Sequence, residues 1–167
     1  MPVELSLLTD VQIFQLLDDA ERATLAALFE QRTYSVGETV FHEGEPGDEI
    51  FLVTEGRVQL FITSDTGEKI IFGENVRGDV FGEISLLDGG PRTAAAVALE
   101  RTTVLTLDRD KLLELVQRHP HVAIDLLTVM GRRLRGTDEL LRTRTARNLN
   151  VEEEAAMTFG EHDHAPT

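Results

Sequence analysis

Cysteine and tryptophan are both absent from this chain of 167 residues, and tyrosine occurs once. The absence of cysteine excludes disulfides, zinc ribbons and a thiol nucleophile. Long apolar runs are missing too, so no stretch could span a bilayer. The segment Met1–Leu5 lacks the basic head and apolar run of a signal peptide. We therefore expect a cytoplasmic protein.

Positive charge is scarce: 16 Lys and Arg residues stand against 30 Asp and Glu residues, which gives a formal net charge of -14. A protein with this net negative charge repels a nucleic-acid backbone unless its basic side chains gather on one face. One basic cluster occurs late in the chain, and we interpret it as the solvated flank of a helix. Its members are Arg132, Arg133, Arg135, Arg142, Arg144 and Arg147. We expect no binding to DNA.

The order of the sequence patterns predicts a mainly β protein with flanking helices. Apolar residues recur with a helical period from about Leu8 to Glu30, where Asp18 or Asp19 can cap a second helix. From about Gln31 to Asp108, short alternating runs are separated by turn residues, which is typical of a sandwich or barrel. The runs cover residues 39–41, 50–53, 58–62, 69–72, 94–98 and 103–107. We predict a β jelly-roll barrel with N-terminal helices and a long C-terminal helix.

Two helices are predicted after the last strand. Asp108 can cap a helix over about Arg109–Gln117, and Pro120 separates it from a longer helix over about His121–Arg147. The domain is expected to cover residues 1–148, followed by an acidic, disordered tail over residues 149–167.

The long helix carries an apolar stripe, because Leu127, Leu134 and Leu141 repeat at intervals of seven residues. Such a stripe can pack on the same barrel or form a seam with a second copy of the chain. We favour the seam and therefore expect a homodimer.

The segment from Phe81 to Ala94 has the pattern of an anion site. Gly82 opens a short helix, Gly89-Gly90-Pro91 ends it, and Arg92 follows among small residues. N–H groups at a helix start attract an oxyanion, and a glycine lets the ligand approach the backbone closely. Arg92 supplies a fork of donors for two phosphate oxygens. Since the Glu83 carboxylate can accept from a sugar hydroxyl, the pattern suits a ribose phosphate.

This segment closely resembles the phosphate-binding cassette of the cyclic-nucleotide-binding family, which includes protein kinase A regulatory subunits, cyclic-nucleotide-gated channels and the bacterial catabolite activator. The cassette runs from Phe81 to Ala98, and the resemblance covers about Leu8 to Arg147. Further matching elements are Gly44, Asp48, Gly56 and Gly78-Asp79.

The resemblance implies a role for each matching residue. The Gly82 and Ser85 amides bind the cyclic phosphate, Glu83 binds the ribose 2′-hydroxyl, and Arg92 pairs with a phosphate oxygen. Thr93 completes the phosphate contact. The whole predicted ligand set is Gly82, Glu83, Ile84, Ser85, Arg92, Thr93, Ala94, Thr137, Leu60 and Phe72.

Leu60 and Phe72, on strands that face the cassette, are expected to line the base, and the long helix is expected to cover it. Residues 130–139 of that helix resemble the one with which the catabolite activator dimerises and closes over the base, and Thr137 falls at its adenine-contacting threonine. Thr93 matches a hydroxyl that reaches guanine in cGMP-preferring sites, but it also occurs in bacterial cAMP sites. We therefore predict cAMP in preference to cGMP.

The resemblance implies a regulatory receptor and not an enzyme, with neither a catalytic residue nor a metal or cofactor besides the ligand. About twenty residues follow the long helix, where the catabolite activator has a helix-turn-helix domain, which supports the expectation of no DNA binding. The stretch Thr145–Glu161 resembles the junction before a small membrane module in some bacterial relatives. A membrane-associated protein is therefore one candidate for the unknown downstream partner.

Two other classes stay open at this point. A degenerate jelly roll could serve as a scaffold that binds no nucleotide. A cupin-like metal enzyme is the third reading, although the histidines are not grouped on the strands as a metal site requires. They are His42, His119, His121, His162 and His164.

Overall fold

The computed structural model describes residues 7–8 and 11–136 of the chain, which divides into two compact units, Met1–Leu126 and Leu127–Thr167. The first unit holds the strands that the structure describes and the helices named below. In the second unit residues 127–136 are described, and they continue a helix that begins at residue 121. Thr137, Leu141 and the tail over residues 149–167 lie outside the described residues.

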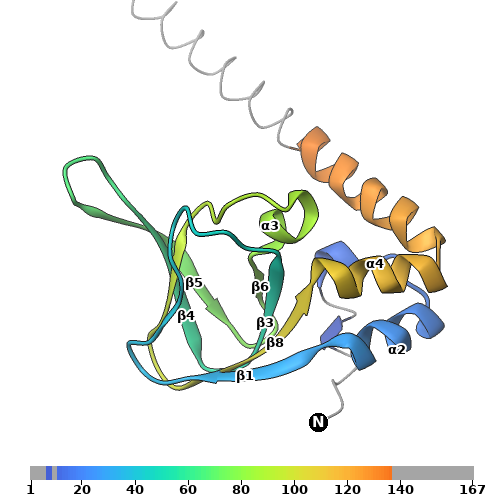
Figure 1. Ribbon diagram of the computed structural model, residues 1–167, viewed down its shortest axis with the longest axis horizontal. Helices are drawn as coiled ribbons and strands as arrows, with labels where there is room; N and C mark the ends of the chain where they lie inside the picture. Colours follow the sequence, from blue (N-terminus) through green and yellow to red (C-terminus); the bar gives the residue numbers. More distant parts are fainter. Residues whose placement is uncertain (1–6, 9–10, 137–167) are drawn as a thin grey trace, which may run out of the picture. The chain divides into compact units, whose positions relative to one another are not determined.

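Two antiparallel sheets of four strands each form the centre of the first unit (Figure 1). The strand order is β1-β8-β3-β6 in one sheet and β2-β7-β4-β5 in the other, so the chain passes repeatedly between the two. The strands are β1 Glu30–Tyr34, β2 Thr39–Phe41, β3 Glu49–Glu55, β4 Arg57–Thr63, β5 Lys69–Val76, β6 Val80–Phe81, β7 Ala95–Ala98 and β8 Thr102–Asp108. This topology confirms the predicted jelly roll with flanking helices.

Three phenylalanine rings fill the space between the sheets. Phe51 of β3 and Phe81 of β6 are register partners, and their rings stack with centroids 5.0 Å apart. Phe41, from β2 of the other sheet, lies 5.6 Å from the Phe51 ring and 5.9 Å from the Phe81 ring. All three are buried, and each contributes about 1.5–3 kcal/mol by leaving water. This aromatic cluster lies directly beneath the candidate site described below.

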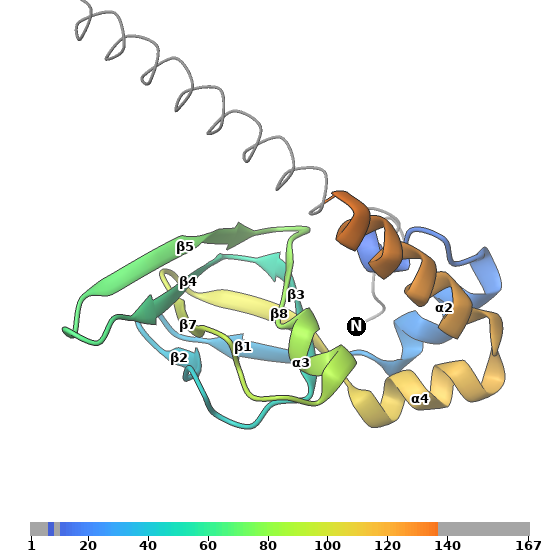
Figure 2. The same cartoon turned by 90° about the horizontal axis from the view of Figure 1, so that it is seen from above.

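Helices α2 (Asp19–Leu28) and α4 (Arg109–Arg118) lie side by side next to the sheets (Figure 2). Asp18 and Glu21 form a capping box at the start of α2, with bonds of 2.8 and 2.9 Å to each other's amides. The Asp108 carboxylate accepts a hydrogen bond from the Lys111 amide at 2.9 Å and caps α4. The predicted cap Asp108 is confirmed, and of the two alternatives Asp18 and Asp19 the structure selects Asp18. None of the described helices combines the length and hydropathy needed to cross a lipid bilayer.

The N-terminal part differs from the prediction in two ways. In the expected first helix, residue 8 is helical, residues 9–10 lie outside the described part of the chain, and Gln12–Phe14 form a short 3-10 turn, η1, whose Ile13 and Phe14 are buried. The strand β1 was not predicted, because its residues are mostly exposed and lack apolar alternation. It forms because it pairs with β8 from Glu30↔Thr106 to Tyr34↔Thr102, and no local pattern reports that pairing. The two-residue strand β6 was also missed, because it forms by pairing with β3, and that pairing leaves no local pattern in the sequence.

Candidate functional site

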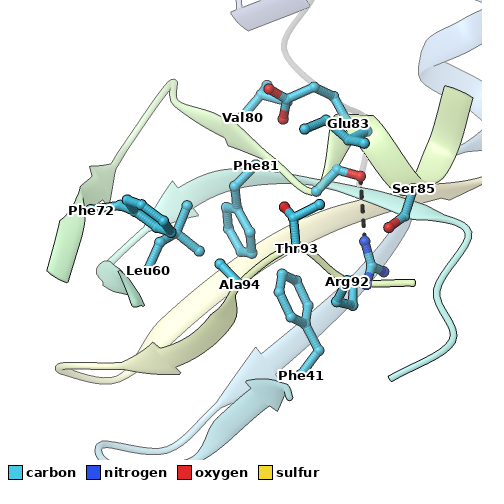
Figure 3. Close-up of a pocket in the computed structure, with 12 residues that line it drawn as sticks. Phe41, Leu60, Phe72, Val80, Phe81, Glu83, Ser85, Arg92, Thr93 and Ala94 are labelled. Carbon is cyan, nitrogen blue, oxygen red and sulfur yellow. Dashed lines mark hydrogen bonds between the residues drawn. The ribbon is translucent and has the colours of Figure 1, made fainter. Parts of the chain in front are cut away.

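A cavity of about 220 Å³ opens between the strand β5 and the short helix α3 (Glu83–Asp88). Figure 3 shows Arg92 and Phe41 on one side of it, with Leu60 and Phe72 at the other end. The cavity is lined by Phe41, Leu60, Phe72, Val80, Phe81, Gly82, Glu83, Ile84, Ser85, Arg92, Thr93 and Ala94. One end is therefore cationic and the other is apolar.

Arg92 is the buried charge of this site, with only 5% of its surface exposed. Its guanidinium carbon lies 4.3 Å from the centre of the Phe41 ring and 5.4 Å from that of Phe51, which is cation–π geometry. Its Nη1 donates to the carbonyl oxygens of Glu49 at 2.9 Å and Gly82 at 3.3 Å, and the second bond is the dashed line in Figure 3. Rings and carbonyls thus fix the orientation of the fork.

Burial makes this guanidinium electrostatically unusual. Desolvation lowers the pKa of Arg92, and the negative charges of Glu49, Asp48 and Glu45 oppose that shift in decreasing order. Within the described residues, however, no carboxylate forms an ion pair with Arg92. A buried cation without a paired anion is costly, so the site is electrostatically prepared for an anionic ligand.

Two glycines make room for the Arg92 side chain. A Cβ on Gly47 would lie 2.1 Å from Arg92 Nε, and one on Gly82 would lie 2.9 Å from Arg92 Nη1. Gly82 also has a φ of 82°, a left-handed conformation that other residues rarely adopt. The sequence singled out Gly82 for a contact with the ligand and not for this space around Arg92, whereas Gly47 carries no signal in the sequence beyond its place in a turn.

Backbone hydrogen bonds join the turn over residues 43–48 to the loop that carries Arg92. The Gly44 amide donates to the Arg92 carbonyl at 2.8 Å, and the Arg92 amide donates to the Glu45 carbonyl at 2.9 Å. Pro46 and Pro91 form an isolated antiparallel bridge beside them. The backbone of Arg92 is therefore held by hydrogen bonds to this turn on both its amide and its carbonyl.

The helix α3 begins at the rim of the cavity. Its first internal hydrogen bond runs from the Leu86 amide to the Gly82 carbonyl at 3.4 Å. The amides of Ile84 and Ser85 precede that bond and have no acceptor within the helix. Ser85 is buried with 2% exposure, and Gly89, with a φ of 68°, ends the helix as the sequence predicts.

Every predicted ligand residue that the structure describes lines this one cavity. The cassette supplies most of them, while Leu60 comes from β4 and Phe72 from β5. At the mouth, Phe72 is 62% exposed and Ile84 is 52% exposed. Thr137 lies outside the described residues, so its contact with the base stays a prediction.

The sequence interpretation did not include three further lining residues, Phe41, Val80 and Phe81, in the ligand set. Phe41 ends a predicted strand, and only the pairing of β2 with β7 brings it under Arg92. In the described part of the chain no group of three or more His, Asp or Glu residues is placed to hold a metal ion. His162 and His164 lie outside that part.

Comparison with known proteins gives consistent matches. The family model for the cyclic nucleotide-binding domain matches residues 31–119. The cyclic AMP receptor protein of Thermus thermophilus is 42% identical over 123 residues, which are 72% of this chain and 57% of that protein. A CRP-like cAMP-activated global transcriptional regulator of Mycobacterium tuberculosis is 33% identical over 77% of this chain and 58% of its own length.

Among solved structures, the N-terminal domain of a transcriptional regulator from Streptomyces coelicolor superposes with a TM-score of 0.76 at 38% identity. The match covers 81% of this chain and 94% of that domain. The matched part of this chain therefore spans a little over half the length of the two relatives and nearly the whole length of this isolated domain.

Proposed function

This chain belongs to the cyclic nucleotide-binding domain family, and we propose that it is a receptor whose cavity holds a purine cyclic nucleotide, cAMP in preference to cGMP. The observation that carries the proposal is the buried guanidinium of Arg92, which faces the cavity without a carboxylate partner among the described residues. A cyclic phosphate has the single negative charge and the paired oxygens that such a fork binds.

The two ends of the cavity fit the two ends of a cyclic nucleotide. We assign the phosphate to Arg92 and to the Gly82 and Ser85 amides, with the Ile84 amide between them at the start of α3. Glu83 lines the same rim and is assigned to the ribose 2′-hydroxyl. The apolar end, with Leu60 and Phe72, offers a stacking surface for the purine.

The preference for cAMP rests on Thr137, which we assign to the adenine 6-amino group. Support comes from two relatives, because the Thermus thermophilus and Mycobacterium tuberculosis proteins are named for cAMP. Thr93 also lines the cavity and could bind guanine, so the base preference is expected to be modest, about 1–2 kcal/mol for one hydrogen bond.

We assign the output to the helix that begins at residue 121. Ligand binding shifts a population only if one helix arrangement binds the nucleotide better than the other, and capping of the base by Thr137 provides that difference. Leu127 and Leu134 expose 67% and 68% of their surface and lie seven residues apart, which supports a homodimer through this helix. The downstream protein, a cytoplasmic location and the lack of DNA binding and catalysis stay predictions from the sequence.

Calorimetric titration of the full chain with cAMP, cGMP and 5′-AMP tests the proposal. We expect saturable binding of both cyclic nucleotides, tighter for cAMP. Binding of 5′-AMP should be much weaker, because its open phosphate carries a second negative charge and Arg92 is the one cationic side chain among the described residues that line the cavity. If neither cyclic nucleotide gives a heat of binding at chain concentrations up to about 100 μM, the proposed receptor function is wrong, and the alternative of a scaffold that binds no nucleotide replaces it. Metal analysis of the purified chain tests the cupin reading.

A further inference from the structure

The arginine Arg32, on the strand β1, holds the carboxylate of Glu49 at the start of β3. Two parallel hydrogen bonds join them, from Nη1 to Oε1 at 3.2 Å and from Nη2 to Oε2 at 2.6 Å. The pair bridges over β8, which lies between β1 and β3 in the sheet. This bidentate arrangement is the strongest form of an arginine–carboxylate contact, and its hydrogen bond raises the pKa of Arg32. Nothing in the sequence pattern pointed to it.

Glu49 lies next to the candidate ligand site as well. Its carbonyl oxygen accepts the 2.9 Å hydrogen bond from Arg92. Glu49 and Phe51 are two residues apart on β3, so their side chains leave the same face of the strand. The Phe51 ring lies under the Arg92 guanidinium, so the Glu49 carboxylate projects on the Arg92 side of the sheet. The negative charge of Glu49 is also the first of those that oppose the lowering of the Arg92 pKa by burial.

We propose that Arg32 is a positioning residue that keeps the Glu49 carboxylate from pairing with Arg92 and so leaves the Arg92 guanidinium open to an anionic ligand. This inference rests on the proposed nucleotide-binding function. Arg32 does not line the cavity, so it acts through Glu49 and not by touching the ligand.

The reason is a competition between two anions for one buried cation. If Arg32 is removed, the Glu49 carboxylate loses both of its guanidinium donors. The buried and unpaired Arg92 then becomes the favourable partner, since pairing relieves the cost of burying its charge. A cyclic phosphate must displace that carboxylate before it can bind, which weakens apparent affinity even though every ligand contact is still available.

Four variants of the full chain, titrated with cAMP, test this competition. Arg32→Gln is expected to raise the Kd about fivefold, a size typical of coupled sites. Glu49→Gln keeps the carbonyl that binds Arg92 but removes the competing charge, so it should bind at least as tightly as the wild type. The double variant Arg32→Gln/Glu49→Gln should return to within about twofold of the wild-type Kd.

The matched control is Arg57→Gln, which breaks another inter-strand pair, Arg57 with Glu74 at 3.1 Å, without touching Arg92. Its Kd should equal that of the wild type. A merely structural role for Arg32 predicts that the double variant binds no better than Arg32→Gln, and that result overturns the inference, as does an unchanged Kd for Arg32→Gln. A wild-type chain that binds neither cyclic nucleotide overturns the proposed function first and this inference with it.

Discussion

The substitution Gly47→Ala tests how strictly the position of Arg92 determines ligand binding. The added Cβ would lie 2.1 Å from Arg92 Nε, 2.6 Å from Cζ and 2.8 Å from Cδ, where an ordinary contact needs at least 3.4 Å. Gly47 does not have a positive φ, so alanine fits its backbone and the collision falls on the arginine. The guanidinium must therefore move by more than about 1 Å.

The side chain has little space for that movement. The Phe41 ring, 4.3 Å away, limits it on one side, and the Gly82 backbone limits it on another. A displaced guanidinium gives up its 2.9 Å bond to the Glu49 carbonyl and its alignment with two phosphate oxygens. A charge-assisted hydrogen bond is worth about 1.5–3 kcal/mol, so we expect a loss of binding free energy on the order of 2–4 kcal/mol. The Kd for cAMP should rise roughly 30- to 700-fold.

Calorimetric titration with cAMP measures this loss, and Gly37→Ala provides the control. Gly37 has a φ of 81° and nothing within 4 Å of an added Cβ, so its substitution strains a turn without reaching Arg92. It should lower the thermal midpoint while leaving the Kd unchanged. If Gly47→Ala binds cAMP as tightly as the wild type, the reasoning about a rigidly placed arginine is wrong.

Four further predictions follow from the same site. Arg92→Leu should abolish measurable cAMP binding, yet the thermal midpoint of the ligand-free chain should stay close to that of the wild type, since removing a buried charge without a carboxylate partner offsets the lost hydrogen bonds to the Glu49 and Gly82 carbonyls. Glu83→Ala should weaken cAMP binding by about tenfold or less and narrow the gap between cAMP and its 2′-deoxy analogue, measured by competition. Thr137→Ala should lower affinity for cAMP and leave that for cGMP nearly unchanged; tighter cGMP binding that Thr93→Ala abolishes would reverse our assignment of the base. Leu134→Glu should give a folded monomer in light scattering, and a wild-type monomer at micromolar concentration would contradict the predicted dimer.

The cassette could be predicted from sequence because its geometry is set by neighbouring residues. Gly82 and Gly89 adopt positive φ at the two ends of α3, and both positions were recognised from the chain alone. The caps Asp18 and Asp108 are local in the same sense, since each bonds an amide three residues away. Apolar strands such as β3, which is buried on both faces, were also found, whereas the exposed strand β1 was not.

What the sequence by itself determined was therefore the jelly-roll pattern, the short helix between its glycines and the arginine that follows. Only the tertiary structure decided what surrounds that arginine. Phe41, Gly47 and Glu49 all lie more than forty positions earlier in the chain and reach Arg92 through the pairing of strands and turns. The physical reason is that the burial and desolvation of a guanidinium, and the carboxylates that compete for it, depend on which residues lie near it in space. The spacing of residues along the sequence does not reveal those neighbours.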